Sequence, residues 1–544
     1  MGAARRHRLA CPDSSSTRRR IVSEVRREAW GGRTAFIVAA VSSAIGLGNI
    51  WRFPGVAYEN GGGAFLLPYV IAFLTAGLPI LFLDYSIGHR FKAAPPLAFK
   101  RLDRRLEPLG WWQVAVCYVI AIYYAVVIAW ALAFTVFSFT RAWGDDAAGF
   151  FFDDFLSAAD AGFSLDLVGK VLWPLLIVWI VTIAVMALGI RRGLERANRV
   201  TLPLLVVLFI AIVIYAVTLD GAADGLNAFF TPSWEALGDP AVWIAAYGHI
   251  FFSFSIAFGI MITYSSYLRR KADLTGSGTV VAFGNCGFEI LAGIGVFATL
   301  GFLAAQQATT IDELEGITGV GLAFVTFPTL LAEMPGGAVI GVLFFLSLVF
   351  AGFTSLLSIL QVVSGAVQDK TGWTPAKAGI VVGIGAAIPS VLLFATTTGV
   401  NTLDVIDAFI NNIGVVTSAV LTLLLVAWVA RSTPRLAAHL NAGGSLHVGP
   451  LWSVMIRFVS PVILAAVLVT GAWSYATDGY GGFPGWYLGV AGWGVIAAVA
   501  VFSFAMSYRR YRREDTEDFA PDDTTELARE VENARSTSRN GGAS

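Results

Sequence analysis

Long apolar stretches limit how this chain of 544 residues can fold more than any other feature. A helix of about 20 apolar residues can cross a hydrocarbon core of about 30 Å, because it satisfies its backbone polar groups internally. Apolar residues make up 56% of the chain and charged residues only 14%, so lipid is its expected solvent. The sequence predicts an all-α polytopic membrane protein with about twelve transmembrane helices. Their approximate ranges are 34–58, 63–89, 111–140, 168–189, 199–219, 241–268, 277–306, 336–368, 376–397, 402–430, 451–475 and 485–508.

The charged residues predict how these spans are oriented. The intervening loops carry mostly Asp and Glu, whereas basic residues gather in every second loop, at 18–20, 90–105, 191–199, 269–271, 431–435 and 509–513. The positive-inside rule then places both termini in the cytoplasm and the protein in the plasma or inner membrane. The formal net charge of zero gives no basic surplus that would favour nucleic acid as a partner.

The two ends of the chain differ from the spans in composition. The first 33 residues are polar and rich in arginine, whereas the last stretch is acidic and has few large apolar residues, which is typical of disorder. The expected organisation is a cytoplasmic arm at 1–33, a ten-helix core at 34–430 with repeats at 34–219 and 241–430, two additional transmembrane helices at 451–508, and an acidic disordered cytoplasmic tail at 509–544.

Two spans contain stretches that are poor in helix-forming residues where a helix should be continuous. The first reads Ser42-Ser-Ala-Ile-Gly-Leu-Gly-Asn49, and the sixth reads Phe251-Phe-Ser-Phe-Ser-Ile-Ala-Phe-Gly259. Unpaired backbone groups cost several kcal/mol each in lipid, so a broken helix is tolerated where it lines a cavity or binds a polar guest. Interruptions five spans apart suggest inverted repeats with a binding site between the broken helices. Kinks that serve only helix packing are the alternative.

The residues around the first interruption resemble the signature of a known family. The stretches Gly46-Leu-Gly-Asn-Ile-Trp-Arg-Phe-Pro54 and Glu59-Asn-Gly-Gly-Gly-Ala-Phe65 are similar to the first span of the neurotransmitter:sodium symporters, in particular the bacterial amino acid symporters of the leucine-transporter type. The likeness extends to Asn285, to Ala351–Ser355 and to Asp407. It implies an inverted repeat of helices 1–5 and 6–10 with helices 1 and 6 broken. It also implies that amino acid uptake is coupled to sodium.

The resemblance implies two sodium sites, both made of the hard oxygen ligands that suit a small cation. The first would use oxygens of the substrate carboxylate and of Ala44, Asn49, Ser253 and Asn285. The second would lie between the first and eighth spans and use carbonyls of Ser42, Ile45 and Ala351 with the hydroxyls of Thr354 and Ser355.

The resemblance also implies a substrate site around both interruptions. Polar groups would hold the carboxylate and ammonium of an amino acid, and apolar side chains would surround its side chain; the set is Ala44, Gly46, Leu47, Gly48, Ile120, Tyr124, Phe252, Ser253, Ser255, Phe258 and Ile359. Amine-transporting relatives have an aspartate at the position of Gly46, so glycine favours an amino acid. An apolar pocket favours a neutral, largely apolar one, but it discriminates a methylene by only about 1 to 3 kcal/mol. Leucine, alanine, methionine and aromatic amino acids therefore remain alternatives.

The resemblance implies that charged residues at the two ends of this site act as gates. For Arg52 and Asp407 the cost of charge inside a membrane also favours a function. For Arg27 and Asp369 a solvated face remains the alternative. On the outer side, Arg52 would pair with Asp407. On the inner side, the expected gate consists of Arg27 and Asp369, supported by Trp30 and Tyr267.

Glu289 follows Asn285 by four residues, and so lies on the same helical face as that expected sodium ligand. Chloride-dependent relatives have a hydroxyl or amide residue at this position, whereas chloride-independent relatives have an acid. A fixed carboxylate can replace a bound anion beside sodium, so we expect transport without chloride. His249, where relatives often have glutamine, is either a hydrogen-bonded structural residue or a proton-sensitive partner of Glu289.

Other classes of function have less support in the sequence. It contains no HExxH, GxSxG or Walker motif, so we expect a transporter and not an enzyme. A membrane sensor or channel that binds sodium and an amino acid without transporting them is the remaining alternative. Sodium-dependent, saturable uptake into proteoliposomes distinguishes the two.

Overall fold

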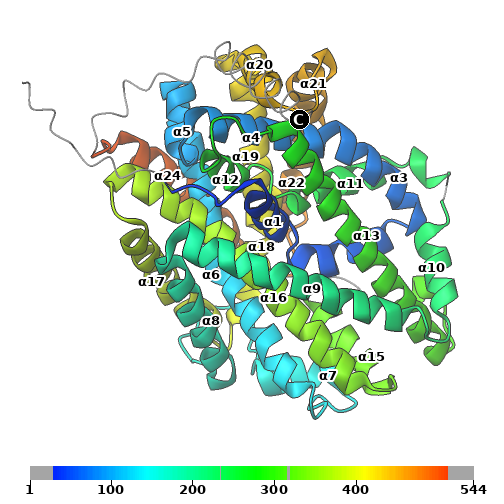
Figure 1. The fold of residues 1–544 in the computed structure, drawn as a ribbon. Helices are drawn as coiled ribbons and strands as arrows, with labels where there is room; N and C mark the ends of the chain where they lie inside the picture. The colour runs from blue at the N-terminus through cyan, green and yellow to red at the C-terminus, as the bar shows by residue number, and fades with distance from the viewer. Residues whose placement is uncertain (1–27, 233, 315–318, 513–544) are drawn as a thin grey trace, which may run out of the picture.

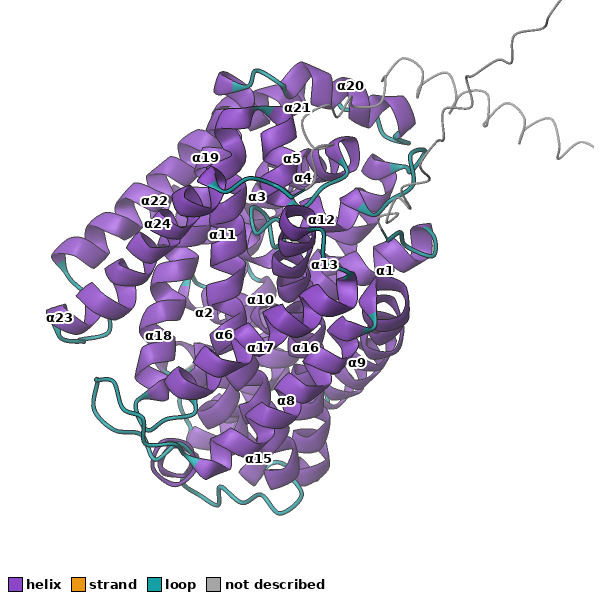
Figure 2. Cartoon of the chain, turned by 90° about the vertical axis from the view of Figure 1, so that its left-hand side faces the viewer, coloured by secondary structure: helices purple, strands orange, loops and turns teal. Residues whose placement is uncertain are grey.

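The computed structural model describes residues 28–232, 234–314 and 319–512. Within these ranges the chain is almost entirely helical, and its only extended pairing is an isolated bridge between Leu167 and Thr396. Figure 2 shows helices joined by loops throughout this part of the chain. The predicted fold class is therefore confirmed. Arg27 and most of the expected arm and tail lie outside the described residues.

The helices follow the predicted spans closely. Ten described helices are long and apolar enough to cross a membrane, and a bent pair at the first predicted span makes eleven. Two shorter helices, α11 (Pro240–Ser253) and α12 (Ile260–Ser266), occupy the sixth predicted span. The predicted number of about twelve spans therefore agrees approximately with the structure.

Most of the other spans are single α-helices or α-helices joined by a π-helical turn. Their bounds are α3 (Gly63–Ala72) with α4 (Leu78–Phe91), α6 (Glu107–Phe137), α8 (Gly169–Ala187), α9 (Glu195–Ala216), α13 (Leu274–Gln307), α16 (Gly337–Thr371), α17 (Pro375–Phe394), α18 (Gly399–Phe409) with α19 (Val416–Leu424), α21 (Pro450–Val454) with α22 (Ser460–Thr477), and α24 (Gly494–Tyr508). Shorter helices in the connections include α5 (Pro95–Leu102), α7 (Ala147–Gly149), α10 (Ala222–Phe230), α15 (Phe327–Glu333) and α20 (Thr433–Gly443).

Acidic side chains fix the start of two spans by capping free amides. Asp239 accepts a hydrogen bond from the Ala241 N–H at the start of α11, at 2.8 Å. Asp273 does the same for the Gly276 N–H at the start of α13, at 2.9 Å. Burial alone would raise the pKa of Asp273, but the N–H groups of Ser445 and Gly276 outweigh it and leave the pKa below its ordinary value.

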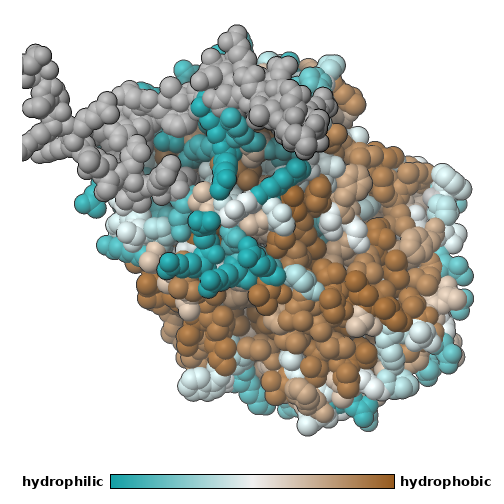
Figure 3. Space-filling view, in the orientation of Figure 1, coloured by the Kyte–Doolittle hydropathy of each residue, from teal (hydrophilic) through white to brown (hydrophobic). Residues whose placement is uncertain are grey.

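The interior is built from a few long helices that others enclose. In Figure 1, α6 and α16 run through the middle of the molecule, and the two helices pack along each other. The apolar window is 72% buried in the α6 span and 78% buried in α13, but only 22% buried in the span that ends with α22 and 28% in the span that ends with α24. Lipid-facing side chains of the outer helices give the largely apolar surface seen in Figure 3. A polar site on the interior helices is therefore shielded from lipid.

Candidate binding site between two broken helices

The first predicted interruption is a break between two helical segments. The helix α1 (Arg33–Ala44) ends before Ile45, which has an extended backbone, and helical structure resumes in the segment Gly48–Glu59. This segment includes α2 (Phe53–Glu59), and its direction differs from that of α1 by 54°. The predicted break in the first span is therefore present.

Side chains meet the backbone amides that this break exposes. The Gly46 N–H donates to Asn49 Oδ1 at 2.9 Å, and the Leu47 N–H donates to the Tyr124 hydroxyl at 3.1 Å. Such amides would otherwise stay unpaired at membrane depth, at a cost of several kcal/mol each. The break is thus stabilised by polar groups that point toward the centre of the molecule.

The second predicted interruption lies between α11 and α12, at residues 254–259. Ser255 and Ala257 have positive φ angles of 50° and 62°, a conformation that costs a residue with a side chain about 1–2 kcal/mol. Neighbouring helices hold this linker in place. The Ser418 hydroxyl donates to the Ala257 carbonyl at 2.8 Å, and the Cys117 thiol donates to the Phe258 carbonyl at 3.0 Å.

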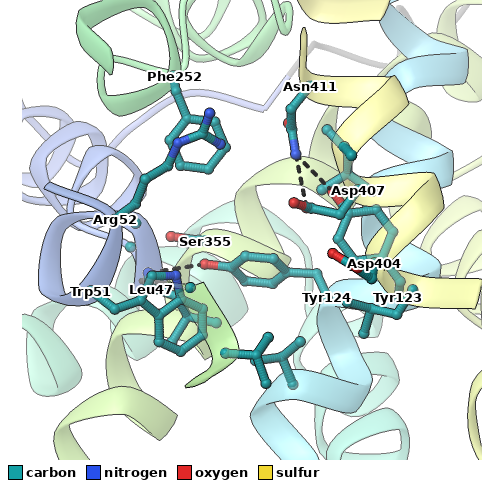
Figure 4. A pocket seen from close by; sticks show the side chains of 18 of the residues that line it. Leu47, Trp51, Arg52, Tyr123, Tyr124, Phe252, Ser355, Asp404, Asp407 and Asn411 are labelled. Carbon is teal, nitrogen blue, oxygen red and sulfur yellow. Dashed lines mark hydrogen bonds between the residues drawn. The ribbon is translucent and has the colours of Figure 1, made fainter. Parts of the chain in front are cut away.

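Both breaks face one cavity of about 610 Å³. All eleven residues that the resemblance assigns to the substrate line it, namely Ala44, Gly46, Leu47, Gly48, Ile120, Tyr124, Phe252, Ser253, Ser255, Phe258 and Ile359. Figure 4 shows Tyr124, Leu47, Phe252 and Ser355 around this space. Residues that are far apart in the sequence, on α1, α6, α11 and α16, therefore line a single cavity.

Glycines in the first break allow close packing against the neighbouring helices α11 and α16. A Cβ on Gly48 would lie 2.3 Å from a ring carbon of Phe252, and a Cβ on Gly46 would lie 2.8 Å from the Ser355 hydroxyl oxygen. Neither distance is compatible with a side chain unless the neighbour moves. Gly48 thus lets the first break approach α11, and Gly46 lets it approach α16.

A chain of hydrogen bonds joins the residues expected at the first sodium site. Asn49 Nδ2 donates to Asn285 Oδ1 at 2.9 Å, and Asn285 Nδ2 donates to the Ser253 hydroxyl at 2.5 Å. All three side chains are buried. Each amide oxygen has a second lone pair, so this cluster offers hard oxygen ligands beside the cavity.

The residues expected at the second sodium site also lie together. The Thr354 hydroxyl is 2.9 Å from the Ser42 carbonyl and 3.0 Å from the Ala351 carbonyl, and the Ser355 hydroxyl is 3.4 Å from the Ser43 carbonyl. The contacts to Ser42 and Ser43 join α1 to α16 directly. Ile45, the fifth expected ligand, is the extended residue that follows α1.

On the outer side, the expected gate residues lie on opposite walls of the cavity. The Arg52 guanidinium lies 4.2 Å above the ring of Phe252, and Asp407 accepts a hydrogen bond from Asn411 Nδ2 at 2.8 Å. Arg52 and Asp407 both line the cavity and face one another across it (Figure 4). Among the described residues, no ion pair joins Arg52 to Asp407.

On the inner side, aromatic residues close the space below the first break. Trp30 is 2% exposed, and its indole N–H donates to the Tyr264 carbonyl at 2.9 Å. The Trp30 ring also makes an edge contact with Tyr267, whose hydroxyl accepts a hydrogen bond from Gln361 at 3.0 Å. Trp30 and Tyr267 are thus brought together as expected.

Of the charged pair expected at the inner gate, only Asp369 lies among the described residues. Asp369 lies near the end of α16 and accepts a hydrogen bond from the Ala94 N–H at 2.7 Å. Arg27 falls outside the described residues, so its expected pairing with Asp369 stays a prediction.

Glu289 and His249 form a hydrogen-bonded pair near the cluster of Asn49, Asn285 and Ser253. His249 Nε2 and Glu289 Oε1 are 2.8 Å apart, and both side chains are fully buried. The other carboxylate oxygen of Glu289 accepts a hydrogen bond from the Tyr69 hydroxyl. A carboxylate is therefore held at a fixed position four residues from Asn285 on α13.

Sequence analysis missed several acidic residues at these sites. Asp84 is buried on α4, and its carboxylate faces the Ala257 N–H at 3.5 Å. An acid inside a predicted apolar span was the signal that could have identified it. Glu59 and Asp404 line the outer part of the cavity, where Asp404 accepts a hydrogen bond from the Tyr480 hydroxyl at 2.8 Å. Both stand near predicted span ends, where acids are common and give no comparable signal.

Comparison with known proteins covers nearly the whole described chain. The Sodium:neurotransmitter symporter family matches residues 27–149 and 144–513. The chain belongs to the sodium:neurotransmitter symporter family. The symporter is 38% identical over 472 residues to an uncharacterized sodium-dependent transporter of Methanocaldococcus jannaschii, and the match covers 86% of the symporter and 95% of that protein. It is 29% identical over 380 residues to the sodium-dependent serotonin transporter of Drosophila melanogaster, covering 64% and 60% of the two chains.

A solved structure has the same fold as the symporter. MhsT in complex with L-phenylalanine is similar with a TM-score of 0.69 and 31% sequence identity, and the match covers 82% of the symporter and 100% of MhsT. The family and fold are those of transporters, and the apolar helices are those of a multi-pass membrane protein. The resemblance inferred from the sequence is therefore confirmed.

Proposed function

We propose that the symporter imports a neutral, largely apolar amino acid together with sodium by alternating access. The convergence of both helix breaks on one cavity carries this proposal, since all eleven expected substrate residues line that cavity. Half-helices that end inside a membrane present partial positive charge at their N-termini and partial negative charge at their C-termini. A zwitterion has one charged group for each kind of end.

The substrate carboxylate would bind where the first break presents its amides. The Leu47 N–H and the Tyr124 hydroxyl already lie 3.1 Å apart, and Gly48 contributes the next amide. The ammonium would bind at the opposite ends, to the carbonyls of Ala44, Phe252 and Ser253 and the hydroxyl of Ser255. Gly46 supplies no acid to neutralise an amine that lacks a carboxylate, and this supports an amino acid over a monoamine.

Apolar side chains would surround the rest of the substrate. Ile120, Phe258 and Ile359 line the cavity from three different segments. The related MhsT was solved with L-phenylalanine, which supports an apolar substrate for the symporter as well. Competition of labelled leucine uptake by alanine, methionine and the aromatic amino acids would order the candidates. If no apolar amino acid competed, this substrate class would be wrong.

Two sodium ions would travel with the amino acid. The cluster of Asn49, Asn285 and Ser253, with the Ala44 carbonyl, would hold the first beside the substrate carboxylate. The second would brace α1 against α16, between carbonyls of Ser42, Ile45 and Ala351 and the hydroxyls of Thr354 and Ser355. Hydroxyl, amide and carbonyl oxygens are the ligands that a small hard cation prefers.

The stoichiometry can be tested by the limit of accumulation. At about 100 mV one inward charge is worth about 2.3 kcal/mol, and an approximately tenfold sodium gradient adds about 1.4 kcal/mol. Two ions would supply roughly 7 kcal/mol and support about 10⁵-fold accumulation, whereas one would support about 500-fold. Uptake into proteoliposomes at set gradients measures this limit. A plateau near the lower value would reject the second sodium ion.

Transport would not require chloride, because the Glu289 carboxylate would stand where an anion balances sodium. His249 and Tyr69 hold that carboxylate in place. Glu289→Ser should make uptake depend on chloride, whereas the unmodified symporter should work equally in chloride and gluconate. Equal activity of both proteins in chloride-free buffer would refute this role.

Opposed gates would alternate access to the cavity. Arg52 and Asp407 would approach each other above the bound substrate, and the inner gate of Arg27, Trp30, Tyr267 and Asp369 would then open. This cycle would operate in the plasma or inner membrane with both termini in the cytoplasm. The ten-helix core at 34–430 would carry it, with the helices at 451–508 as an addition. A sensor or channel with the same ligands would bind sodium and the amino acid but would show no saturable, sodium-dependent accumulation.

A further inference from the structure

Exposed arginines gather where α9 begins, on the perimeter of the helix bundle and away from the cavity. Arg191 and Arg192 lie in the π-helical turn η5 (Ile190–Leu194), and Arg196 and Arg199 lie in the first turns of α9. All four are exposed. In Figure 3 a hydrophilic patch occupies this position and is bordered below by apolar surface.

The same side of α9 continues as an apolar stripe. Its exposed residues follow Arg196 at intervals of three or four, which keeps them on one face of the helix: Val200 (65% exposed), Leu204 (40%), Val207 (63%), Ile210 (40%) and Ile214 (62%). Exposed apolar side chains on a membrane-spanning helix face acyl chains. The arginines therefore stand at the headgroup end of a lipid-facing stripe.

We propose that Arg192, Arg196 and Arg199 bind the phosphate of an anionic phospholipid whose acyl chains lie along this stripe. The three residues are spaced by four and three positions, so their side chains share one face of the helical segment. Planar guanidinium groups bind phosphate oxygens through paired hydrogen bonds. Glu195 is the one acid in residues 188–202, and the Glu28 carboxylate accepts a hydrogen bond from the Ile190 N–H at 3.1 Å. Four arginines thus face two acids, so positive charge predominates in this patch.

Glu195 connects the patch to the segment that closes the inner side. Its carboxylate accepts hydrogen bonds from Arg199 at 2.8 Å and from the Gly31 N–H at 3.0 Å. Gly31 directly follows Trp30. The Glu195 side chain is 9% exposed and that of Arg199 is 67% exposed, so the arginine can turn to a phosphate while the carboxylate stays in place.

Lipid binding should therefore favour opening of the inner side, a consequence that rests on the proposed function. When Arg199 turns to a phosphate, the Glu195 carboxylate keeps its buried position but loses its neutralising partner. A buried charge without a partner is costly, which weakens the docked arrangement of Glu195 and Gly31. Anionic lipid should then increase the rate of uptake.

Lipid selectivity of the purified, reconstituted symporter tests the binding proposal. Association of spin-labelled phosphatidylglycerol and phosphatidylcholine is compared for the unmodified protein and for Arg192→Gln/Arg196→Gln, which leaves the pair of Arg199 and Glu195 intact. The variant removes two guanidinium groups that would hydrogen-bond the phosphate, so its preference for phosphatidylglycerol should fall at least about tenfold. The matched control, Arg509→Gln/Arg510→Gln, removes the same charge from exposed residues after α24 and should keep most of the preference.

Each outcome decides for or against the lipid site. Equal losses in the two double variants, or no preference in the unmodified protein, would overturn it. Displacement of phosphatidylglycerol by inorganic phosphate would also overturn it, because the ligand would then be a soluble anion. Binding is measured without sodium or amino acid, so its failure is distinct from failure of the proposed function.

A second measurement tests the link to transport. In phosphatidylcholine vesicles the Arg192→Gln/Arg196→Gln variant should take up amino acid at the rate of the unmodified symporter, which also shows that it is folded. Phosphatidylglycerol should accelerate only the unmodified protein and the Arg509→Gln/Arg510→Gln control. Equal acceleration of all three proteins would reject the connection through Glu195.

Discussion

The two ends of the central cavity are built differently. On the outer side, Arg52 lies over Phe252 and Asp407 is held by Asn411, and cavity space separates the two charges. On the inner side, Trp30 is nearly fully buried. It packs against Tyr264 at a ring distance of 5.1 Å and donates a hydrogen bond to the Tyr264 carbonyl. One end is thus lined by facing charges, whereas the other is filled by packed rings.

This difference indicates which contacts each step of the proposed cycle must make or break. Closing the outer side requires charged groups to approach across a space that already exists. Opening the inner side requires buried aromatic surface and several hydrogen bonds to be given up, which is the costlier change. In the proposed cycle, this arrangement would be the state that receives substrate from outside.

Replacement of Trp30 by alanine should have the largest effect, because it removes the central ring of the inner packing. Truncation of a buried Trp costs about 3–5 kcal/mol, enough to shift the equilibrium toward an open inner side by roughly 150-fold to 5,000-fold. The readout is alkylation of Ser358→Cys on α16, in a background without the native cysteines; Ser358 is buried and hydrogen-bonded to Tyr264.

The alkylation rate at position 358 should rise strongly in the Trp30→Ala protein. Trp173→Ala on α8 is the matched control, because that side chain is 68% exposed and far less constrained. An unchanged rate with Trp30→Ala would show that the packed rings do not keep the inner side closed.

Gly48→Ala should act on the outer side by displacing Phe252. The added methyl would lie 2.3 Å from the ring, and overpacking of this kind costs about 1–3 kcal/mol. We expect amino acid binding to weaken by about 10 to 100-fold, measured with a labelled substrate on purified protein. Gly32→Ala is the control, because a Cβ there meets nothing within 4 Å. Unchanged affinity in Gly48→Ala would mean that Phe252 does not cover the substrate.

Asp407→Asn should affect uptake more than binding, because it removes the charge that faces Arg52 but keeps the oxygen that Asn411 contacts. Loss of a charged hydrogen-bonding partner is worth about 1.5–3 kcal/mol, so uptake should fall at least about tenfold. Inner accessibility at position 358 should not change. If binding and uptake both stayed intact, Asp407 would have no role in an outer gate.

Tyr267→Phe should give the smallest effect. It removes the hydroxyl that accepts the 3.0 Å hydrogen bond from Gln361 but keeps the ring beside Trp30. A neutral hydrogen bond contributes about 1 kcal/mol, so inner accessibility should rise about fivefold. A change as large as that of Trp30→Ala would indicate that hydrogen bonding, and not ring packing, holds the inner side.

The first helix break could be predicted from local sequence, whereas the shape of the second could not. Glycines at 46 and 48 weaken any helix, and their signature was sufficient to infer both the break and the family. Ser255 and Ala257 carry no such signal, yet both adopt left-handed conformations. The linker accepts a hydrogen bond from Ser418, a residue of a distant helix that no local pattern connects to it.

The candidate site was predicted better than its surroundings. Expected residues such as Tyr124 and Asn285 share one cavity or lie beside it, because a long family signature fixed their positions in the chain. Asp84 was missed although its place inside an apolar span was a signal, whereas Glu195 gave none, because it contacts Gly31 from a helix far away in the sequence. Burial and pairing of such acids are properties of the packed molecule and are not encoded in their neighbours along the chain.

Equilibrium binding of labelled L-phenylalanine to the purified symporter, in sodium and in potassium, tests the central claim most directly. We predict saturable binding in sodium that is absent in potassium and abolished by Asn285→Ala, which removes one amide from the cluster beside the cavity. Equal binding in the two cations would contradict a site shared by an amino acid and sodium between the broken helices.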